Sequence, residues 1–481
     1  MALKDEGNTH LLLDARIVHE TQNVRLALGV VEKDARNPLF REAFFADPPK
    51  RWEARIDNMY PTVIYDDQDQ QFKLWYCCYI FDENSNITPL EQRPTTVYRG
   101  GQNEDGLLYA ISSDGIHWER PDLGLIEFEN STQNNLVMRV TTHGIHAGGV
   151  IKDEHDPDPT RRYKCFYRNR AQRRMAVAFS EDGLRWSEPE LWPEHNAVGD
   201  SHNNALWAPE LDRYVGFTRG WTIEPYHGLR TVLRTESLDF VHWTAPAEIL
   251  RGQDEHDQIY SMPVFRYRNL YLGLPALFHK GNREAPDWDT VTTELAWSPD
   301  TLTWQRICPG EALIPTGEGH YPDGAYDCGC VYAAAPIVQG ETVRLYYGGS
   351  NGLHNNWREG SFNLVTLRLD RFAGYVQNSW DAPGTITTKT LLTQTGELTV
   401  NSEIHPGGRL RVAIYDQENT PLPGYGFEDC QPIETGALAA PVHWSGRRFS
   451  ELAGFPIRLI FELTAAKLYA FAGCSGRTVN V

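Results

Sequence analysis

Ser113-Asp114-Gly115-Ile116-His117-Trp118 is one of four short segments in which an aspartate is followed four residues later by a tryptophan. The other three are Glu181-Asp182-Gly183-Leu184-Arg185-Trp186, Leu238-Asp239-Phe240-Val241-His242-Trp243 and Pro299-Asp300-Thr301-Leu302-Thr303-Trp304. Their tryptophans recur at intervals of 68, 57 and 61 residues (118 to 186, 186 to 243, 243 to 304). Self-similarity at such a period is typical of one repeated supersecondary unit. A unit of this length, built from strand-like segments, predicts a blade of a β-propeller.

Between these turns the sequence alternates in short strand-like runs bounded by Gly, Pro, Asn and Asp. A clear second strand recurs five times, at 72–79, 163–168, 214–219, 270–274 and 343–348. These runs predict five blades, at 55–135, 136–195, 196–252, 253–318 and 319–380. The preceding residues 1–54 are expected to pack on the propeller or to close it, and 385–481 read as further strands of an accessory domain. The predicted fold class is all-β, a five-bladed β-propeller (55–380) followed by a C-terminal β-sandwich (385–481).

The composition excludes several classes of partner. Among 481 residues there are 45 Lys plus Arg against 64 Asp plus Glu, a net charge of −19, which argues against nucleic acid or an anionic membrane. The 14 tryptophans suit both propeller packing and stacking on a sugar ring. The N-terminus shows no apolar stretch of a signal peptide, and no run is long enough to span a membrane. We therefore expect a cytoplasmic protein with a carbohydrate substrate; a trimmed secreted form and a homo-oligomer stay open.

Four aspartates precede the first strand of a blade at one equivalent position: Asp57, Asp200, Asp257 and Asp323. In a propeller the start of the first strand and the end of the second lie on one face, around the mouth of the central channel, where loops hold the site. A single aspartate there is often a turn former, but four at one position favour function. Crowded carboxylates push some pKa values up and leave a protonated acid beside an ionised base, which glycosidic cleavage needs. These four residues are the predicted catalytic set.

Basic and polar side chains near these positions are predicted to bind the substrate. Blade two carries two histidines where the other blades carry an aspartate, and the ends of the second strands add further groups. The predicted set is His143, His146, Arg168, Arg219, His202, His256, Glu255, His320, Asp327 and His354. Since no ligand spacing typical of a metal site is present, we expect no cofactor; a divalent ion held by histidines at the channel axis is the alternative.

Several motifs resemble the five-bladed propeller glycoside hydrolases. They are the Ser-Asp-Gly-x-x-Trp turn, the Trp52-Glu53 pair before Tyr60-Pro-Thr-Val, and Leu345-Tyr-Tyr-Gly-Gly. The similar groups are the arabinanases and xylosidases and the invertases and levanases, with the mannoside phosphorylases as cousins. The resemblance covers about 50–380 and implies Asp57 as nucleophile or base, a blade-two aspartate that steadies charge, and a blade-three glutamate as acid. This chain departs from it, with His143 and His146 in blade two, Asp200 in blade three, and no Asn-Asp-Pro-Asn-Gly signature.

Together these features predict a glycoside hydrolase in which Asp57 is base or nucleophile and Asp200 is the acid, while Asp257 and Asp323 bind hydroxyls or modulate pKa values. A long insertion at 81–106 follows a second strand, so it is expected to wall one side of the mouth. Such a wall suits an exo-acting enzyme.

Two alternatives stay open. One is a phosphorylase or other transferase in which Arg168, Arg170 and Arg219 hold phosphate, and the other is a non-catalytic carbohydrate-binding propeller.

Overall fold

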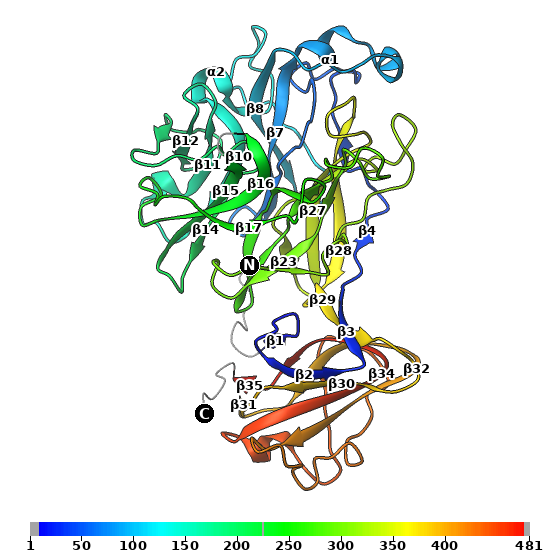
Figure 1. The fold of residues 1–481 in the computed structure, drawn as a ribbon. Helices are drawn as coiled ribbons and strands as arrows, with labels where there is room; N and C mark the ends of the chain where they lie inside the picture. The colour runs from blue at the N-terminus through cyan, green and yellow to red at the C-terminus, as the bar shows by residue number, and fades with distance from the viewer. Residues whose placement is uncertain (1–8, 224–225, 476–481) are drawn as a thin grey trace.

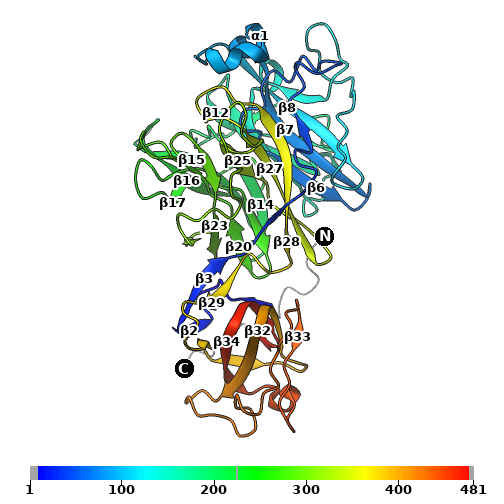
Figure 2. The same ribbon diagram turned by 90° about the vertical axis from the view of Figure 1, so that its right-hand side faces the viewer.

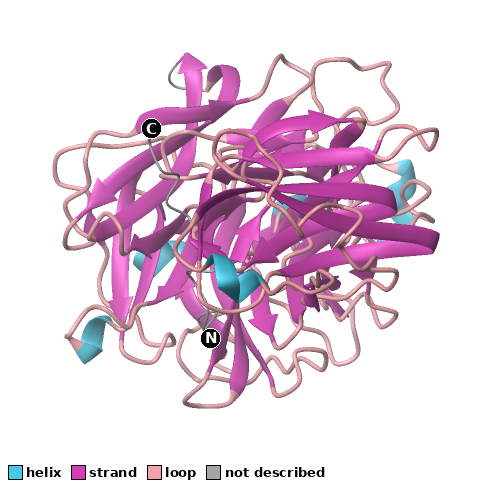
Figure 3. Cartoon of the chain, turned by 90° about the horizontal axis from the view of Figure 1, so that it is seen from below, coloured by secondary structure: helices cyan, strands magenta, loops and turns pink. Residues whose placement is uncertain are grey.

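The computed structural model describes residues 9–223 and 226–475, nearly all of them in strands and loops (Figure 3). In this part of the chain the α-helices are single short turns, α1 (Glu83–Ile87) and α2 (Val140–His143). None of the described helices is long and apolar enough to cross a membrane. The N-terminal segment in which no signal peptide is recognised falls in residues 1–8, outside the described part.

Four antiparallel sheets of four strands each follow one another along the chain and form a propeller-like body (Figure 1). They are β6 (Thr62–Asp66), β7 (Gln71–Asp82), β8 (Asn103–Ser112) and β9 (Leu136–Arg139); β10 (Ile145–Lys152), β11 (Tyr163–Asn169), β12 (Arg174–Ser180) and β13 (Glu190–Leu191); β14 (Asn204–Ala208), β15 (Arg213–Ile223), β16 (His227–Ser237) and β17 (Ala247–Arg251); and β19 (Val264–Tyr267), β20 (Leu270–Gly273), β23 (Leu295–Ser298) and β24 (Gln305–Ile307). The predicted all-β class and the propeller arrangement are confirmed.

The strands predicted for a fifth blade do not form a separate sheet. Hydrogen bonds join β25 (Cys330–Ala333), β26 (Ile337–Gln339), β27 (Thr342–Ser350) and β28 (Gly360–Arg368) to β18 (Gln258–Ser261), β21 (Ala276–Phe278), β22 (Val291–Thr293), β4 (Glu32–Lys33) and β5 (Phe40–Arg41) in a nine-stranded sheet. The link is a parallel pairing of β22 with β25, made at Val291 and Cys330. The strand pairing therefore separates four blades where the sequence predicts five.

Each Asp-to-Trp segment forms the turn after the third strand of a four-stranded sheet. In all four turns one carboxylate oxygen of the aspartate accepts the backbone N–H groups two and three residues ahead, at 2.8 or 2.9 Å. Two of the tryptophans pack on the preceding sheet: Trp243 lies 4.8 Å from Phe166 and Trp304 lies 6.2 Å from Phe217, between ring centroids. Trp118 of the first blade packs on Phe362 of β28 at 5.2 Å, which brings the start and the end of the propeller together.

A cavity of about 300 Å³ lies among the inner strands, lined by residues 61–64, 149–153, 202, 204–207, 263–264 and 335. A buried cluster of tyrosines contacts one of the residues that line it. In this cluster the ring of Tyr332 lies 6.0 Å from that of Tyr60 and 5.8 Å from that of Tyr260, and Tyr60 stacks on His202, which lines the cavity. Two of these tyrosines, Tyr60 and Tyr260, also line the site described below.

The C-terminal strands form a second body below the propeller (Figure 2). They are β29 (Ala373–Gln377), β30 (Gly384–Thr388), β31 (Leu391–Thr393), β32 (Thr399–Tyr415), β33 (Ala440–Pro441), β34 (Pro456–Ala472) and β35 (Cys474–Ser475), joined by β1 (Thr9–Leu11), β2 (Val18–Gln22) and β3 (Val24–Leu28). Hydrogen bonds link all ten into one sheet, so the pairing does not show the two sheets of a sandwich. The N-terminal segment contacts both bodies, because β1–β3 pair here while β4 and β5 pair with β28.

Candidate active site

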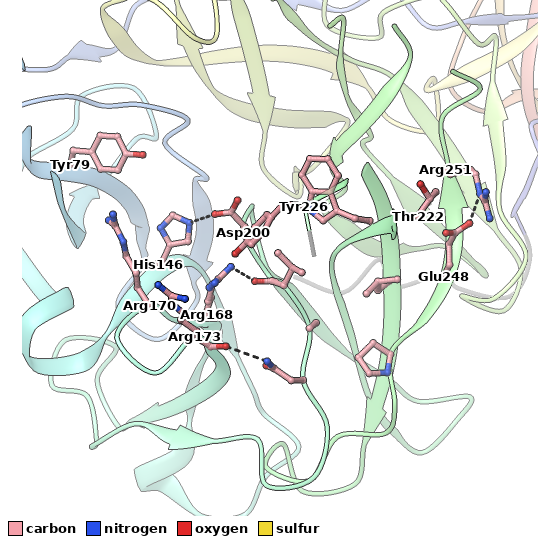
Figure 4. Close-up of a pocket in the computed structure, with 16 residues that line it drawn as sticks. Tyr79, His146, Arg168, Arg170, Arg173, Asp200, Thr222, Tyr226, Glu248 and Arg251 are labelled. Carbon is pink, nitrogen blue, oxygen red and sulfur yellow. Dashed lines mark hydrogen bonds and ion pairs between the residues drawn. The ribbon is translucent and has the colours of Figure 1, made fainter. Parts of the chain in front are cut away.

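Two adjoining cavities, of about 1120 and 420 Å³, share Tyr79, His146 and Asp200 in their walls. We call them together the active-site cavity. In the larger one Arg168, Arg170 and Arg173 lie on the side of His146 and Asp200, and Glu248 and Arg251 lie on the far side (Figure 4). The smaller one is lined by Asp57, Asp105, Tyr98, Tyr260 and His354.

Asp57 stands just before β6 and is held by two buried arginines. Its Oδ1 accepts hydrogen bonds from Arg358 Nη2 at 2.5 Å and from Arg55 Nε at 3.1 Å. Burial alone would raise the pKa of this carboxyl, but the two guanidinium groups hold it well below its usual range. Asp57 is therefore an ionised carboxylate at neutral pH, as a base or a nucleophile must be.

His146 lies between two carboxylates from neighbouring blades. Its Nε2 is 3.0 Å from Asp200 Oδ1, at the start of the third blade, and its Nδ1 is 3.2 Å from Asp105 Oδ2, on β8 of the first. Burial by itself lowers the pKa of His146, yet the pair of carboxylates raises it to about 9. At neutral pH the imidazole is therefore protonated and can give up a proton.

The same contacts do not favour the acid role predicted for Asp200. Arg219 Nη2 donates to Asp200 Oδ2 at 2.5 Å. Burial would raise the pKa of Asp200, but Arg219 and His146 hold it well below its usual range. A general acid needs the opposite shift. In this cavity His146, rather than Asp200, carries a proton to donate at neutral pH.

Two of the four predicted catalytic aspartates, Asp57 and Asp200, lie in the active-site cavity, and the other two do not line it. Asp257 is bound through both oxygens by Arg306, at 2.6 and 3.1 Å, and Asp323 is exposed. The reason is their distance from the strand that follows. β6 and β14 begin at Thr62 and Asn204, a few residues after their aspartates, whereas β18 begins directly after Asp257 and β25 only at Cys330.

Three of the predicted binding residues, His146, Arg168 and His354, line the cavity, and Arg219 supports it from behind Asp200. The His354 side chain is neutral, because burial and the nearby Arg358 hold its pKa well below its usual value; its Nδ1 lies 3.0 Å from the Tyr332 hydroxyl. His202 faces the central cavity instead, and burial lowers its pKa to about 3.

The remaining predicted binding residues, His143, Glu255, His256, His320 and Asp327, do not line the active-site cavity. Asp327 is fully buried and pairs with Lys33 at 2.7 Å, which is a structural contact. His143 ends α2, where its Nδ1 accepts from the backbone N–H of Arg139, and Glu255 and His320 are exposed on loops. His256 pairs with Asp287 at 3.2 Å.

Sequence reasoning missed Asp105, Arg55 and Arg358. The signal for Asp105 was present: β8 runs antiparallel to β7, so its first residues lie on the same face as the end of β7. Asp105 stands near the start of a third strand, a position that an alignment of first-strand starts and second-strand ends does not include. Arg358 carries no comparable signal, because it reaches Asp57 from a loop 301 residues away in the chain.

Among the described residues one group of three could hold a metal ion. It consists of His256, His279 and Asp287, whose ligand atoms lie within 4.8 Å of one another. However, His256 Nδ1 accepts the backbone N–H of Asn282 at 3.3 Å, which leaves the ring proton on Nε2, facing Asp287. The pair is therefore an ordinary hydrogen bond, and a metal would require the other tautomer of His256. This group is not the histidine cluster expected at the axis.

No known protein-family profile matches this chain, and no curated protein matches it. Several solved structures are similar to it at low identity. An N-acetylgalactosamine deacetylase from F. plautii is 15% identical with a TM-score of 0.45, over 73% of this chain and 97% of that one. A glycosyl hydrolase from Bacteroides ovatus is 15% identical with a TM-score of 0.47, over 71% and 94%. A β-1,2-mannobiose phosphorylase from Listeria innocua is 14% identical with a TM-score of 0.46, over 70% and 96%.

Proposed function

We propose that this protein is a glycoside hydrolase that cleaves a terminal glycosidic bond. The observation that carries the proposal is the pairing, in one cavity, of an ionised carboxylate, Asp57, with a protonated imidazole, His146. Glycosidic cleavage needs a group that donates a proton to the leaving oxygen and a carboxylate that attacks the anomeric carbon or activates water. His146 takes the first role and Asp57 the second.

Asp200 and Asp105 position His146 and set its pKa in this mechanism. Once the imidazolium has given one proton to the leaving oxygen, its neutral ring keeps a single N–H, which can bind only one of the two carboxylates, and its other nitrogen can take a proton from water. Arg219 and Arg170 hold these carboxylates in place, with nitrogens 2.5 Å from Asp200 and from Asp105 respectively. The exo action follows from the insertion, since Tyr98, Arg99 and Gly100 form one wall of the smaller cavity. No cofactor takes part in the proposed reaction.

We also propose that the propeller has five blades, with β25, β27 and β28 as the fifth. Five chain segments, one from each blade, line the central cavity, and Trp118 packs on Phe362 across the junction of the last blade and the first. The ten-stranded C-terminal body is proposed to fold as a sandwich around a buried core that includes Leu398, Val412 and Phe461.

The test is cleavage of a panel of aryl glycosides, furanosides included. On the substrate found, Asp57→Asn should lower kcat by about 10²- to 10⁴-fold, because a positioned acid–base or nucleophilic group contributes on that order. Asp200→Asn should also lower kcat, since it removes one of the charges that keep His146 protonated. Asp323→Asn, an exposed residue outside the cavity, is the matched control and should keep full activity. Near-normal turnover of Asp57→Asn would overturn the assignment.

A glycoside phosphorylase is the second candidate, favoured by the number of arginines around the cavity. Arginine binds phosphate through two parallel hydrogen bonds. The two reactions separate in one assay: a strict phosphorylase is idle without phosphate and releases a sugar phosphate with it, whereas a hydrolase releases free sugar in either buffer.

A further inference from the structure

The active-site cavity carries more positive charge than its carboxylates need. Three carboxylates, Asp57, Asp105 and Asp200, are already contacted by five cationic groups: Arg55, Arg358, Arg170, Arg219 and the imidazolium of His146. Three more arginines, Arg99, Arg168 and Arg173, line the cavity, and no carboxylate of the described residues pairs with them. The excess stands out in a chain whose net charge is −19. Arginines that served only to neutralise the aspartates would not leave this surplus.

Two of these three arginines, Arg168 and Arg173, line the larger cavity, as His146 does. Arg168 is the cross-strand partner of His146 between β10 and β11, and Arg173 lies in the turn that leads into β12 (Figure 4). Arg168 Nη1 donates to the backbone carbonyl of Val198 at 2.5 Å, a neutral acceptor that fixes the guanidinium without cancelling its charge. The other N–H groups of the Arg168 guanidinium are available to a ligand in the cavity.

Two aromatic side chains line the same cavity as the two arginines. Trp221 and Tyr226 also line the larger cavity, and their rings lie 6.2 Å apart, edge to face. The guanidinium carbon of Arg168 lies 5.9 Å from the centroid of the Tyr226 ring. A ligand that fits this place has an apolar ring face for the aromatic side chains and an anionic oxygen pair for the guanidinium groups.

We propose that the substrate is an anionic sugar, whose carboxylate or sulfate group is bound by Arg168 and Arg173 while its glycosidic oxygen faces His146. This inference rests on the proposed function for the position of the reacting bond, but the binding site itself does not depend on cleavage. A uronic acid and a sulfated sugar offer the same chemistry to the arginines, and the experiment separates them.

The test is equilibrium binding measured by calorimetry, with glucuronate, galacturonate, galactose 6-sulfate, the neutral parent sugars and inorganic phosphate as separate ligands. At least one anionic sugar should bind about ten times or more tightly than its neutral parent, with affinity that falls as salt rises. Arg173→Gln should weaken that binding by about 10- to 100-fold, the loss typical of a hydrogen bond to a charged group. Arg251→Gln is the matched control: it removes the same charge from the far side of the cavity, where Arg251 already pairs with Glu248.

Equal affinity for anionic and neutral sugars would overturn the inference, as would equal losses in the Arg173 and Arg251 variants. Binding of inorganic phosphate that displaces the anionic sugars and is itself lost in Arg173→Gln would also overturn it, in favour of the phosphorylase. Failure of the proposed function is distinguishable: Arg173-dependent binding of an anionic sugar without cleavage of any glycoside leaves the site standing and removes only the hydrolase. Cleavage of neutral and anionic glycosides at equal rates, both by the native protein and by Arg173→Gln, leaves the hydrolase standing and removes the anionic-sugar site.

Discussion

His146 is the residue on which the proposed chemistry depends, and its titration gives a prediction. Its pKa is raised from its ordinary value to about 9, so the proton it donates is present at neutral pH and is lost as the pH rises through about 9. The folding free energy gained from its contacts with Asp105 and Asp200 is fully present below about pH 6.5, the ordinary pKa of histidine. It is lost as the pH rises through about 9. We therefore expect kcat to fall on the alkaline side near pH 9.

The pH profile of kcat in the native protein and in His146→Gln measures this prediction. The variant should lose activity by about 10²-fold or more, since it has no proton to donate, and its residual rate should lack the alkaline limb. His242→Gln is the control, because His242 pairs with Asp239 at 2.7 Å in an exposed turn and should leave the profile unchanged. An alkaline limb that persists in His146→Gln would assign the proton to another group.

At the scale of elements, the four turns show which parts of the fold the sequence could predict. Each turn is closed by its own aspartate, which accepts N–H groups two and three residues ahead, so the motif needs nothing from the rest of the chain. The fifth set of strands joins a larger sheet instead. That pairing depends on a contact between Val291 of β22 and Cys330 of β25, which lie far apart in the sequence. In the same way Asp57 is found from its place before a strand, whereas Arg358 is brought to it only by the folded loop.

The insertion after β7 gives a prediction at this scale. Tyr98 stands in its wall, donates to Asp82 Oδ1 at 2.9 Å, and lies under the guanidinium of Arg55 at 4.1 Å from ring centroid to Cζ. Tyr98→Ala should remove one side of the smaller cavity and raise KM for small glycosides by about 10-fold, the worth of one aromatic contact, with a smaller change in kcat. Val97→Ala alters an exposed neighbour in the same loop and should change neither value. An unchanged KM in Tyr98→Ala would mean that the insertion does not contact the sugar.

For the whole molecule, the blades are held together at the axis by a small apolar cluster. Tyr60, Tyr260 and Tyr332 meet there with Ala147 and Phe278, residues from four of the five predicted blades. The period of the repeat predicts that blades surround a central axis. It does not predict which side chains fill this axis, because they lie at different distances in sequence from the aspartate of their blade. Tyr60 and Tyr260 follow their aspartates by three residues, whereas the third ring is Tyr332 and not Tyr326, the residue at the equivalent offset from Asp323.

The last prediction concerns this axial cluster. Tyr332 is 3% exposed, and its hydroxyl lies 3.0 Å from His354 Nδ1, so Tyr332→Ala leaves a cavity and an unpartnered imidazole. Loss of a buried aromatic side chain costs about 3–5 kcal/mol of unfolding free energy, and we expect the midpoint of thermal unfolding to fall by several degrees. Tyr226→Ala, which removes an identical but 45% exposed ring, should shift the midpoint little. Equal shifts in the two variants would show that the axial cluster contributes no more to stability than an exposed ring does.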